Sequence, residues 1–210
     1  MRARRGKVVV AEARWLLGMV GVFALMLIVV LVVQQTNTSE DSSATPSSPP
    51  SGTLGPTSTV DLGSMTPREA ASALFTRVMT AVEADDQAEA QLFLPMAIAS
   101  YDRIAALSLD DRFHLSLLHA VGGDGAMALA VADAGLAVRP THLLCLAAAA
   151  EAALLLGDEE LARAHYRTLV DVYDAEIEAG LEEYGPQEAN GHANLLPLFR
   201  EQARGFLAGS

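Results

Sequence analysis

The five histidines and the single cysteine are the side chains of this sequence best suited to hold a metal ion. His114 and His119 lie five residues apart, which places them about 140° apart around a helix, so they cannot share a face. No His-Glu-x-x-His or Cys-x-x-Cys spacing occurs. These residue types therefore predict no metal site and no cofactor.

Four acidic residues follow one another at intervals of three, four and four positions: Asp171, Asp174, Glu178 and Glu182. This spacing predicts four carboxylates along one face of a long helix, where adjacent like charges reduce helix stability. Two interpretations remain open: a solvated outer face, or a binding strip for a basic or amide-rich segment of a partner. A catalytic carboxylate pair would also need a pocket that shifts the pKa of one member, and no pattern in the sequence indicates such a pocket.

Motifs for nucleophilic catalysis and phosphate binding are missing from the sequence. No Gly-x-Ser-x-Gly motif occurs, and the glycine-rich stretch 122–125 is not followed by Gly-Lys-Ser or Gly-Lys-Thr, so we interpret it as a turn. Cys145 lies in an Ala- and Leu-rich stretch and is expected to be a small buried apolar side chain. We therefore expect no catalytic residues and a protein that is not an enzyme, with an unrecognised active site as a minor alternative.

The N-terminal part of the chain predicts a membrane anchor. Residues 15–33 carry no charge and, at about 1.5 Å per residue, can cross the roughly 30 Å hydrocarbon core as one helix. A cleavable signal peptide is the alternative, but the run is longer than usual and no Ala-x-Ala site follows it. Five of the 14 basic residues lie in the tail 1–14, so the tail is expected in the cytoplasm and the C-terminal domain in the periplasm or outside the cell.

A linker and an acidic domain are expected after the anchor. Residues 34–64 are rich in Ser, Thr and Pro, a composition that cannot offset the entropy cost of ordering, so they are expected to form a disordered tether. Beyond residue 33 the chain has nine arginines and 25 acidic residues, a net charge of −16. Such a chain repels phosphate groups, which excludes a DNA or RNA partner.

Capping signals and apolar spacing predict helices from residue 65 onward. Thr66, Pro67 and Glu69 form a capping-box start, and apolar residues then follow at helical spacing to about residue 84. Asp86 offers a similar second start, and Pro95 is expected either to kink that helix or to begin a new one.

The stretch 113–174 matches itself at a period of 34 residues. Gly123 falls on Gly157, each followed by Asp, and Ala128 falls on Ala162. An Ala- and Leu-rich helix precedes each glycine and an apolar helix follows it. Two helices joined by a glycine-led turn form a hairpin, in which a small alanine at the crossing allows close approach.

This pattern resembles the tetratricopeptide repeat. The residues that match the family pattern are Leu115, Gly123, Ala128, Leu136, Pro140, Gly157, Ala162 and Tyr166. The residues that depart from it are Ser116, which replaces a glycine, and His119 and Ala132, which stand at aromatic positions. The resemblance covers about residues 68–176 and implies an all-α, right-handed stack of antiparallel helical hairpins, with repeats at about 66–107, 109–142 and 143–176.

A terminal element is expected after the repeats. The helical pattern runs on to about Glu183 and is broken at Gly185 and Pro186. A final amphipathic helix at about 194–207 would cover the last apolar face of the stack, as terminal elements of repeat arrays do. The helical domain is therefore expected to span residues 65–208.

The leading functional hypothesis is a membrane-anchored, extracytoplasmic scaffold or adaptor that binds a protein or peptide along the inner groove of the stack. The resemblance implies work in assembly or secretion at the cell envelope. Candidate groove residues on the first helices are Arg112, His119 and Glu151, in addition to the four carboxylates. The alternative is a regulatory or sensor module, in which the basic tail contacts a cytoplasmic partner and the anchor signals across the membrane whether the domain has bound its ligand.

Overall fold

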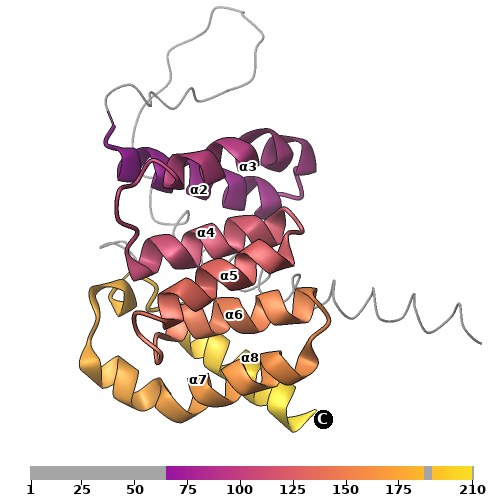
Figure 1. The fold of residues 1–210 in the computed structure, drawn as a ribbon, viewed down its shortest axis with the longest axis vertical. Helices are drawn as coiled ribbons and strands as arrows, with labels where there is room; N and C mark the ends of the chain where they lie inside the picture. Colours follow the sequence, from indigo (N-terminus) through magenta and orange to yellow (C-terminus); the bar gives the residue numbers. More distant parts are fainter. Residues whose placement is uncertain (1–64, 187–190, 210) are drawn as a thin grey trace, which may run out of the picture.

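In a computed structural model of the chain, residues 65–186 and 191–209 are described, and this part contains helices but no strand (Figure 1). The α-helices are α2 (Pro67–Glu83), α3 (Gln87–Tyr101), α4 (Leu109–Val121), α5 (Gly125–Leu136), α6 (Leu143–Leu155), α7 (Glu159–Ala179) and α8 (Leu196–Ala208). The all-α fold predicted from the sequence is confirmed for these residues. The predicted tail, membrane-spanning helix and linker lie outside the described residues. Among the helices that are described, none is both long enough and apolar enough to cross a membrane.

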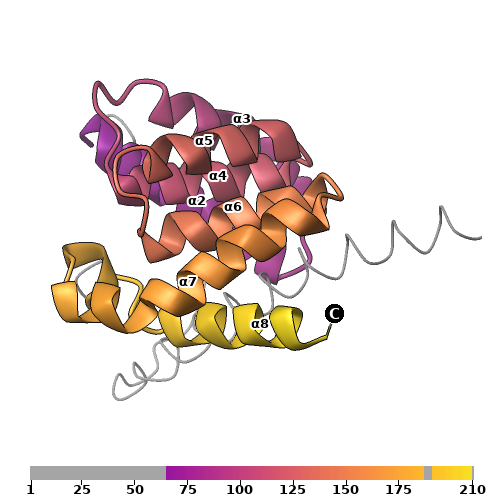
Figure 2. The same ribbon diagram turned by 60° about the horizontal axis from the view of Figure 1, so that its bottom comes forward.

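The helices pack in consecutive pairs, α2 with α3, α4 with α5, and α6 with α7. Each following helix also contacts both members of the preceding pair: α4 contacts α2 and α3, α6 contacts α4 and α5, and α8 contacts α6 and α7. Figure 2 shows α8 lying beside α7 at the end of the stack. Helix α8 therefore occupies the place that the first helix of a fourth pair would take.

The turn within each pair follows from two residue types. Gly123 and Gly157 have positive φ angles of 76° and 77°, and the aspartate after each one caps the next helix by accepting a hydrogen bond from a backbone N–H. The first pair has Asp85 at φ 56° in the same place, because a short polar side chain tolerates the left-handed region better than most. The predicted glycine-led turns are confirmed, and so is the capping box between Thr66 and Glu69.

Small side chains allow the paired helices to approach closely. Ala128 and Ala162 are fully buried. The Ser116 hydroxyl donates a 2.8 Å hydrogen bond to the Ala128 carbonyl, which satisfies this buried polar group. Gly135 lies so close to Cys145 that a Cβ atom there would come within 2.5 Å of the sulfur. Cys145 is buried as predicted, and burial raises the pKa of its thiol to about 12.

The apolar core runs along the stack in two clusters. The larger cluster surrounds α6 and includes Phe113, Tyr166 and Phe199. The smaller cluster joins α2, α3 and α4 and includes Val78 and Tyr101. Helix α6 is buried along almost its whole length because α4, α5, α7 and α8 all contact it.

One helix boundary departs from the sequence prediction, and the two alternatives at Pro95 are resolved. Pro95 lies on the exposed surface within α3, which continues through it as one helix. Helix α7 ends at Ala179, so the prediction of a helix reaching Glu183 is wrong; Gly180 takes the left-handed conformation, at φ 64°, that ends it. A short 3-10 helix, η2 (Glu182–Tyr184), follows, and α8 begins at Leu196.

Candidate functional site

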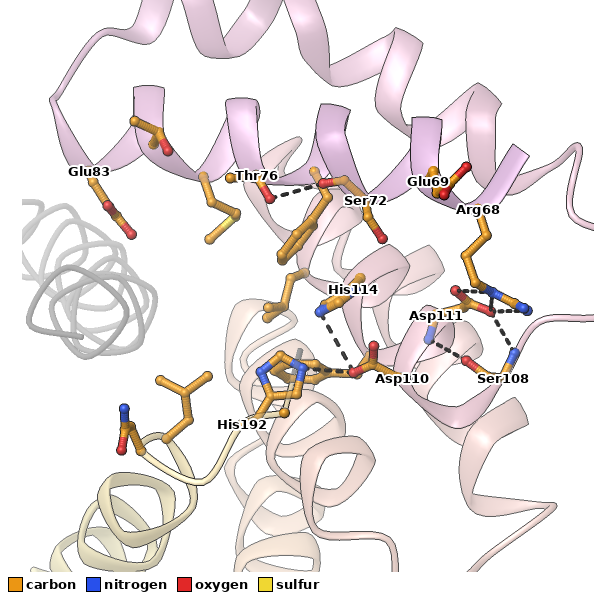
Figure 3. A pocket seen from close by; sticks show the side chains of 18 residues that line it. Arg68, Glu69, Ser72, Thr76, Glu83, Ser108, Asp110, Asp111, His114 and His192 are labelled. Carbon is orange, nitrogen blue, oxygen red and sulfur yellow. Dashed lines mark hydrogen bonds and ion pairs between the residues drawn. The ribbon is translucent and has the colours of Figure 1, made fainter. Parts of the chain in front are cut away.

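A cavity of about 640 Å³ opens between α2, α4 and the segment 191–195 that precedes α8 (Figure 3). Its volume falls in the range of ordinary ligand pockets. The large apolar side chains of its lining are Phe75, Met79, Phe113, Leu117 and Leu195. The polar and charged residues of its lining are Arg68, Glu69, Ser72, Thr76, Thr80, Glu83, Ser108, Asp110, Asp111, His114, His192 and Asn194.

The stacking of the helix pairs explains the position of the cavity. On α2 the lining residues recur every three or four positions from Arg68 to Glu83, so they share one helical face. On α4 they lie between Asp110 and Leu117. Both helices are the first members of their pairs. The cavity therefore lies on the side of the stack that the first helices form.

Three side chains that can bind a proton or a metal ion converge where α4 meets the segment 191–195 (Figure 3). Asp110 and His114 lie one turn apart on α4, and His192 reaches them from the segment before α8. His192 Nε2 donates a hydrogen bond of 2.7 Å to Asp110 Oδ1, and His114 Nε2 lies 3.7 Å from the same oxygen. One ligand atom from each residue lies within 4.8 Å of the other two.

Aromatic packing holds the two imidazole rings of this cluster. His114 stacks on Phe75 with ring centroids 4.1 Å apart, and the edge of His192 packs against Phe113 at 5.3 Å. The two histidine rings meet edge to face at 5.2 Å. The positions of the imidazoles are therefore set by α2 and α4 as well as by Asp110.

Burial and hydrogen bonding set the charge state of the cluster. Burial lowers the pKa of His114 to about 4, against the opposing effect of Asp110. Burial alone would raise the pKa of Asp110, but the hydrogen bond from His192 and the electrostatic influence of the neighbouring imidazoles outweigh it, so the pKa of Asp110 lies below its usual value. At neutral pH, Asp110 is a carboxylate and His114 is uncharged.

An ion pair next to the cluster fixes α2 to the start of α4. Arg68 Nη2 and Nε donate hydrogen bonds of 2.8 and 3.1 Å to Asp111 Oδ2, and Nη2 also reaches the Ala106 carbonyl at 3.0 Å. Asp111 also accepts a hydrogen bond of 2.8 Å from the Ser108 backbone N–H, which completes a capping box. Burial raises the pKa of Asp111, but Arg68 and Ser108 outweigh that effect and hold it below its usual value.

The Asp110, His114 and His192 cluster can coordinate a divalent transition metal or carry a proton, because imidazole nitrogen and carboxylate oxygen serve both purposes. The sequence prediction did not include this cluster, because His114 and His119 do not share a helix face. The spacing of Asp110 and His114 by four residues was a readable signal. The approach of His192, 82 positions from Asp110, follows only from the fold.

None of the predicted groove residues on the first helices lines the cavity. Arg112 is half-buried and turns toward Gly135 of α5, and His119 is half-buried in the last turn of α4. Glu151 is only 5% exposed, where it accepts hydrogen bonds from the Tyr166 hydroxyl and from Gln202 of α8. Glu151 is therefore buried beneath α8, which covers that part of the first-helix side.

The four predicted carboxylates do not share one helix. Asp171, Asp174 and Glu178 are exposed on α7, whereas Glu182 lies in η2, beyond the end of the helix at Ala179. Asp174 forms an ion pair of 2.8 Å with Arg200 of α8. None of the four carboxylates lines the cavity, and Asp174 is already paired with a residue of the same chain.

Comparison of the chain with protein-family models, with curated proteins and with solved structures finds no match. The site that the described residues define has two parts. One is the cavity with its apolar side chains, and the other is the cluster of Asp110, His114 and His192 in its wall.

Proposed function

We propose that this protein is a membrane-anchored, extracytoplasmic scaffold of tetratricopeptide-like hairpins that binds a segment of a partner protein. Three helix pairs with equivalent turns, each stacked on the next in the same way and followed by α8 as a cap, support the repeat interpretation. The 34-residue period and the buried alanines at the helix crossings agree with it.

The cavity between α2 and α4 is the observation that carries the proposal. Stacked helical hairpins bind partners on the surface formed along the stack, and the cavity lies on the side of the first helices. Helix α8 occupies the same side farther along, over Glu151 of α6. The first two hairpins are therefore the part of this side where a partner segment would bind.

The lining of the cavity indicates the chemistry of that segment. Phe75, Met79 and Leu117 offer an apolar surface for one bulky apolar side chain. Glu83 lies at one end, where one of its carboxylate oxygens is buried without a hydrogen-bond partner and burial raises its pKa. A lysine or arginine of the partner would supply a donor there. We therefore expect an apolar side chain flanked by a basic residue, in line with the acidic surface of the domain.

The anchor predicted at residues 15–33 would determine where the domain meets its partner. A tether of the length of residues 34–64 would keep the domain near the membrane, so the partner is expected to be a membrane or envelope protein. Assembly or secretion at the cell envelope is the setting that suits such a scaffold.

Proximity labelling in the native host, with the labelling tag fused after Ser210, tests the proposal. Ser72→Trp would fill the cavity from an exposed position on α2, and Ala88→Trp, at an exposed position on α3, is the matched control. We expect Ser72→Trp to lose one extracytoplasmic partner that the control retains, and Glu83→Lys to weaken its capture. Capture that Ser72→Trp leaves unchanged would refute the cavity as the binding site, and labelling of cytoplasmic proteins alone would refute the orientation.

A further inference from the structure

We propose that Asp110, His114 and His192 form a binding site for one divalent first-row transition metal ion, with zinc as the ion to test. The proposal goes beyond the partner-binding function and does not depend on it, because the three ligands belong to the chain itself. Two imidazoles and one carboxylate are a ligand set that such ions accept, with at least one position left for water or another donor.

The distances within the cluster fit this coordination. Around a tetrahedral zinc ion with bonds near 2.0–2.1 Å, neighbouring ligand atoms lie about 3.4 Å apart. The two distances from Asp110 Oδ1 are 2.7 Å to His192 Nε2 and 3.7 Å to His114 Nε2, one below and one above that value. The ligand atoms of the three residues all lie within 4.8 Å of one another, so each pair is within about 1.4 Å of the tetrahedral separation.

His114 provides an independent observation that points to a ligand. The residue is only 8% exposed, and its Nε2 atom is buried without a hydrogen-bond partner. A buried polar atom in that state costs about 1–3 kcal/mol unless a partner satisfies it. The stacking on Phe75 holds the ring with this nitrogen turned toward Asp110 and His192 (Figure 3). A metal ion between the three side chains would satisfy it.

The charges around the cluster favour a cation. Asp111 follows Asp110 on α4, and Glu69 and Glu83 also line the cavity. Arg68 is the single lysine or arginine among the described residues of the lining, and Asp111 holds its guanidinium. The remaining coordination position would face the cavity. Because two ligands lie on α4 and the third in the segment 191–195, the bound ion would link these two elements.

Metal titration of the purified full-length chain in detergent, after treatment with a chelator, tests this site. Zinc binding is measured by calorimetry, and cobalt binding by the visible absorption that reports its coordination geometry. We expect one ion per chain. We also expect Asp110→Asn and His192→Gln to weaken binding roughly 100-fold or more, because losing a ligand should cost at least as much as losing its outer-shell partner.

The control variants remove other potential ligands of the chain. His165→Gln and Cys145→Ala should bind zinc as tightly as the unmodified protein, since neither residue belongs to the cluster. Far-ultraviolet circular dichroism checks that each variant is folded, and His114→Phe, which keeps a ring against Phe75, serves as a third ligand variant. Absence of stoichiometric binding, or binding that His192→Gln leaves unchanged, would overturn the proposal.

Discussion

Replacing Glu151 with glutamine should stabilise the helical domain at neutral and alkaline pH. Glu151 lies between α6, α7 and α8, only 5% exposed, and burial raises its pKa to about 7 while hydrogen bonds from Tyr166 and Gln202 oppose the shift. The second carboxylate oxygen of Glu151 and the side-chain oxygen of Gln202 are both buried without partners. A glutamine at this position would keep an acceptor for Tyr166 and add a donor to a region that has unpaired acceptors.

The sign and size of the effect follow from the pKa. The folded state holds the proton of Glu151 more tightly than the unfolded state, whose pKa is near 4.5, so this residue makes the protein less stable as the pH rises from 4.5 through 7. A difference of about 2.5 pKa units at about 1.4 kcal/mol per unit sets the loss above pH 7 at roughly 3–4 kcal/mol. Glu151→Gln removes this loss, and at about pH 4 the two proteins should have similar stability.

Urea unfolding of the full-length chain in detergent, followed by far-ultraviolet circular dichroism across this pH range, measures the effect. The only tryptophan, Trp15, lies in the predicted anchor, so its fluorescence would not report on the helical domain. Glu201→Gln, at an exposed glutamate of α8, is the control and should leave the pH dependence unchanged. A stability difference between the Glu151 variant and the unmodified protein that does not change with pH would refute the reasoning.

Three further changes test the packing and the caps. Gly135→Ala should cost about 1–3 kcal/mol of stability, because the added Cβ would collide with the sulfur of Cys145. Adding Cys145→Ala should restore most of this stability, and a double-mutant cycle measured by urea unfolding checks the coupling. Asp111→Asn should lower the stability of the domain by about 1–2 kcal/mol at neutral pH. This value is in the lower part of the range for charged hydrogen bonds, because the Arg68 side chain is half-exposed to solvent. The lowered pKa of Asp111 makes its contribution present above the unfolded pKa and lost as the pH falls, so the cost should vanish in acid unfolding measurements. Asp158→Ala should cost about 1 kcal/mol through the lost cap of α7, measured as a lower thermal midpoint, and an unchanged midpoint would contradict that role.

The proposed metal site contains residues that the sequence can bring together and one that only the fold can place. The pair of Asp110 and His114 can be read from the sequence, because residues four apart on a helix lie on one face. His192 could not be assigned to them, since its approach depends on where residues 191–195 pack against α4. The burial of Glu151, a predicted groove residue, could not be read from the sequence for the same reason: α8 lies over it, and the position of α8 is a tertiary property.

The sequence by itself determined the features that depend on neighbouring residues. The capping box at Thr66, the turns at Gly123 and Gly157 and the all-helical content involve hydrogen bonds and backbone angles within about four residues, so residue types and spacing suffice to predict them. Only the tertiary structure decided which side chains meet across distant elements. The cavity between α2 and α4 and the contact of His192 with Asp110 arise from helix packing, where the burial of many apolar side chains together sets the positions of a few polar ones.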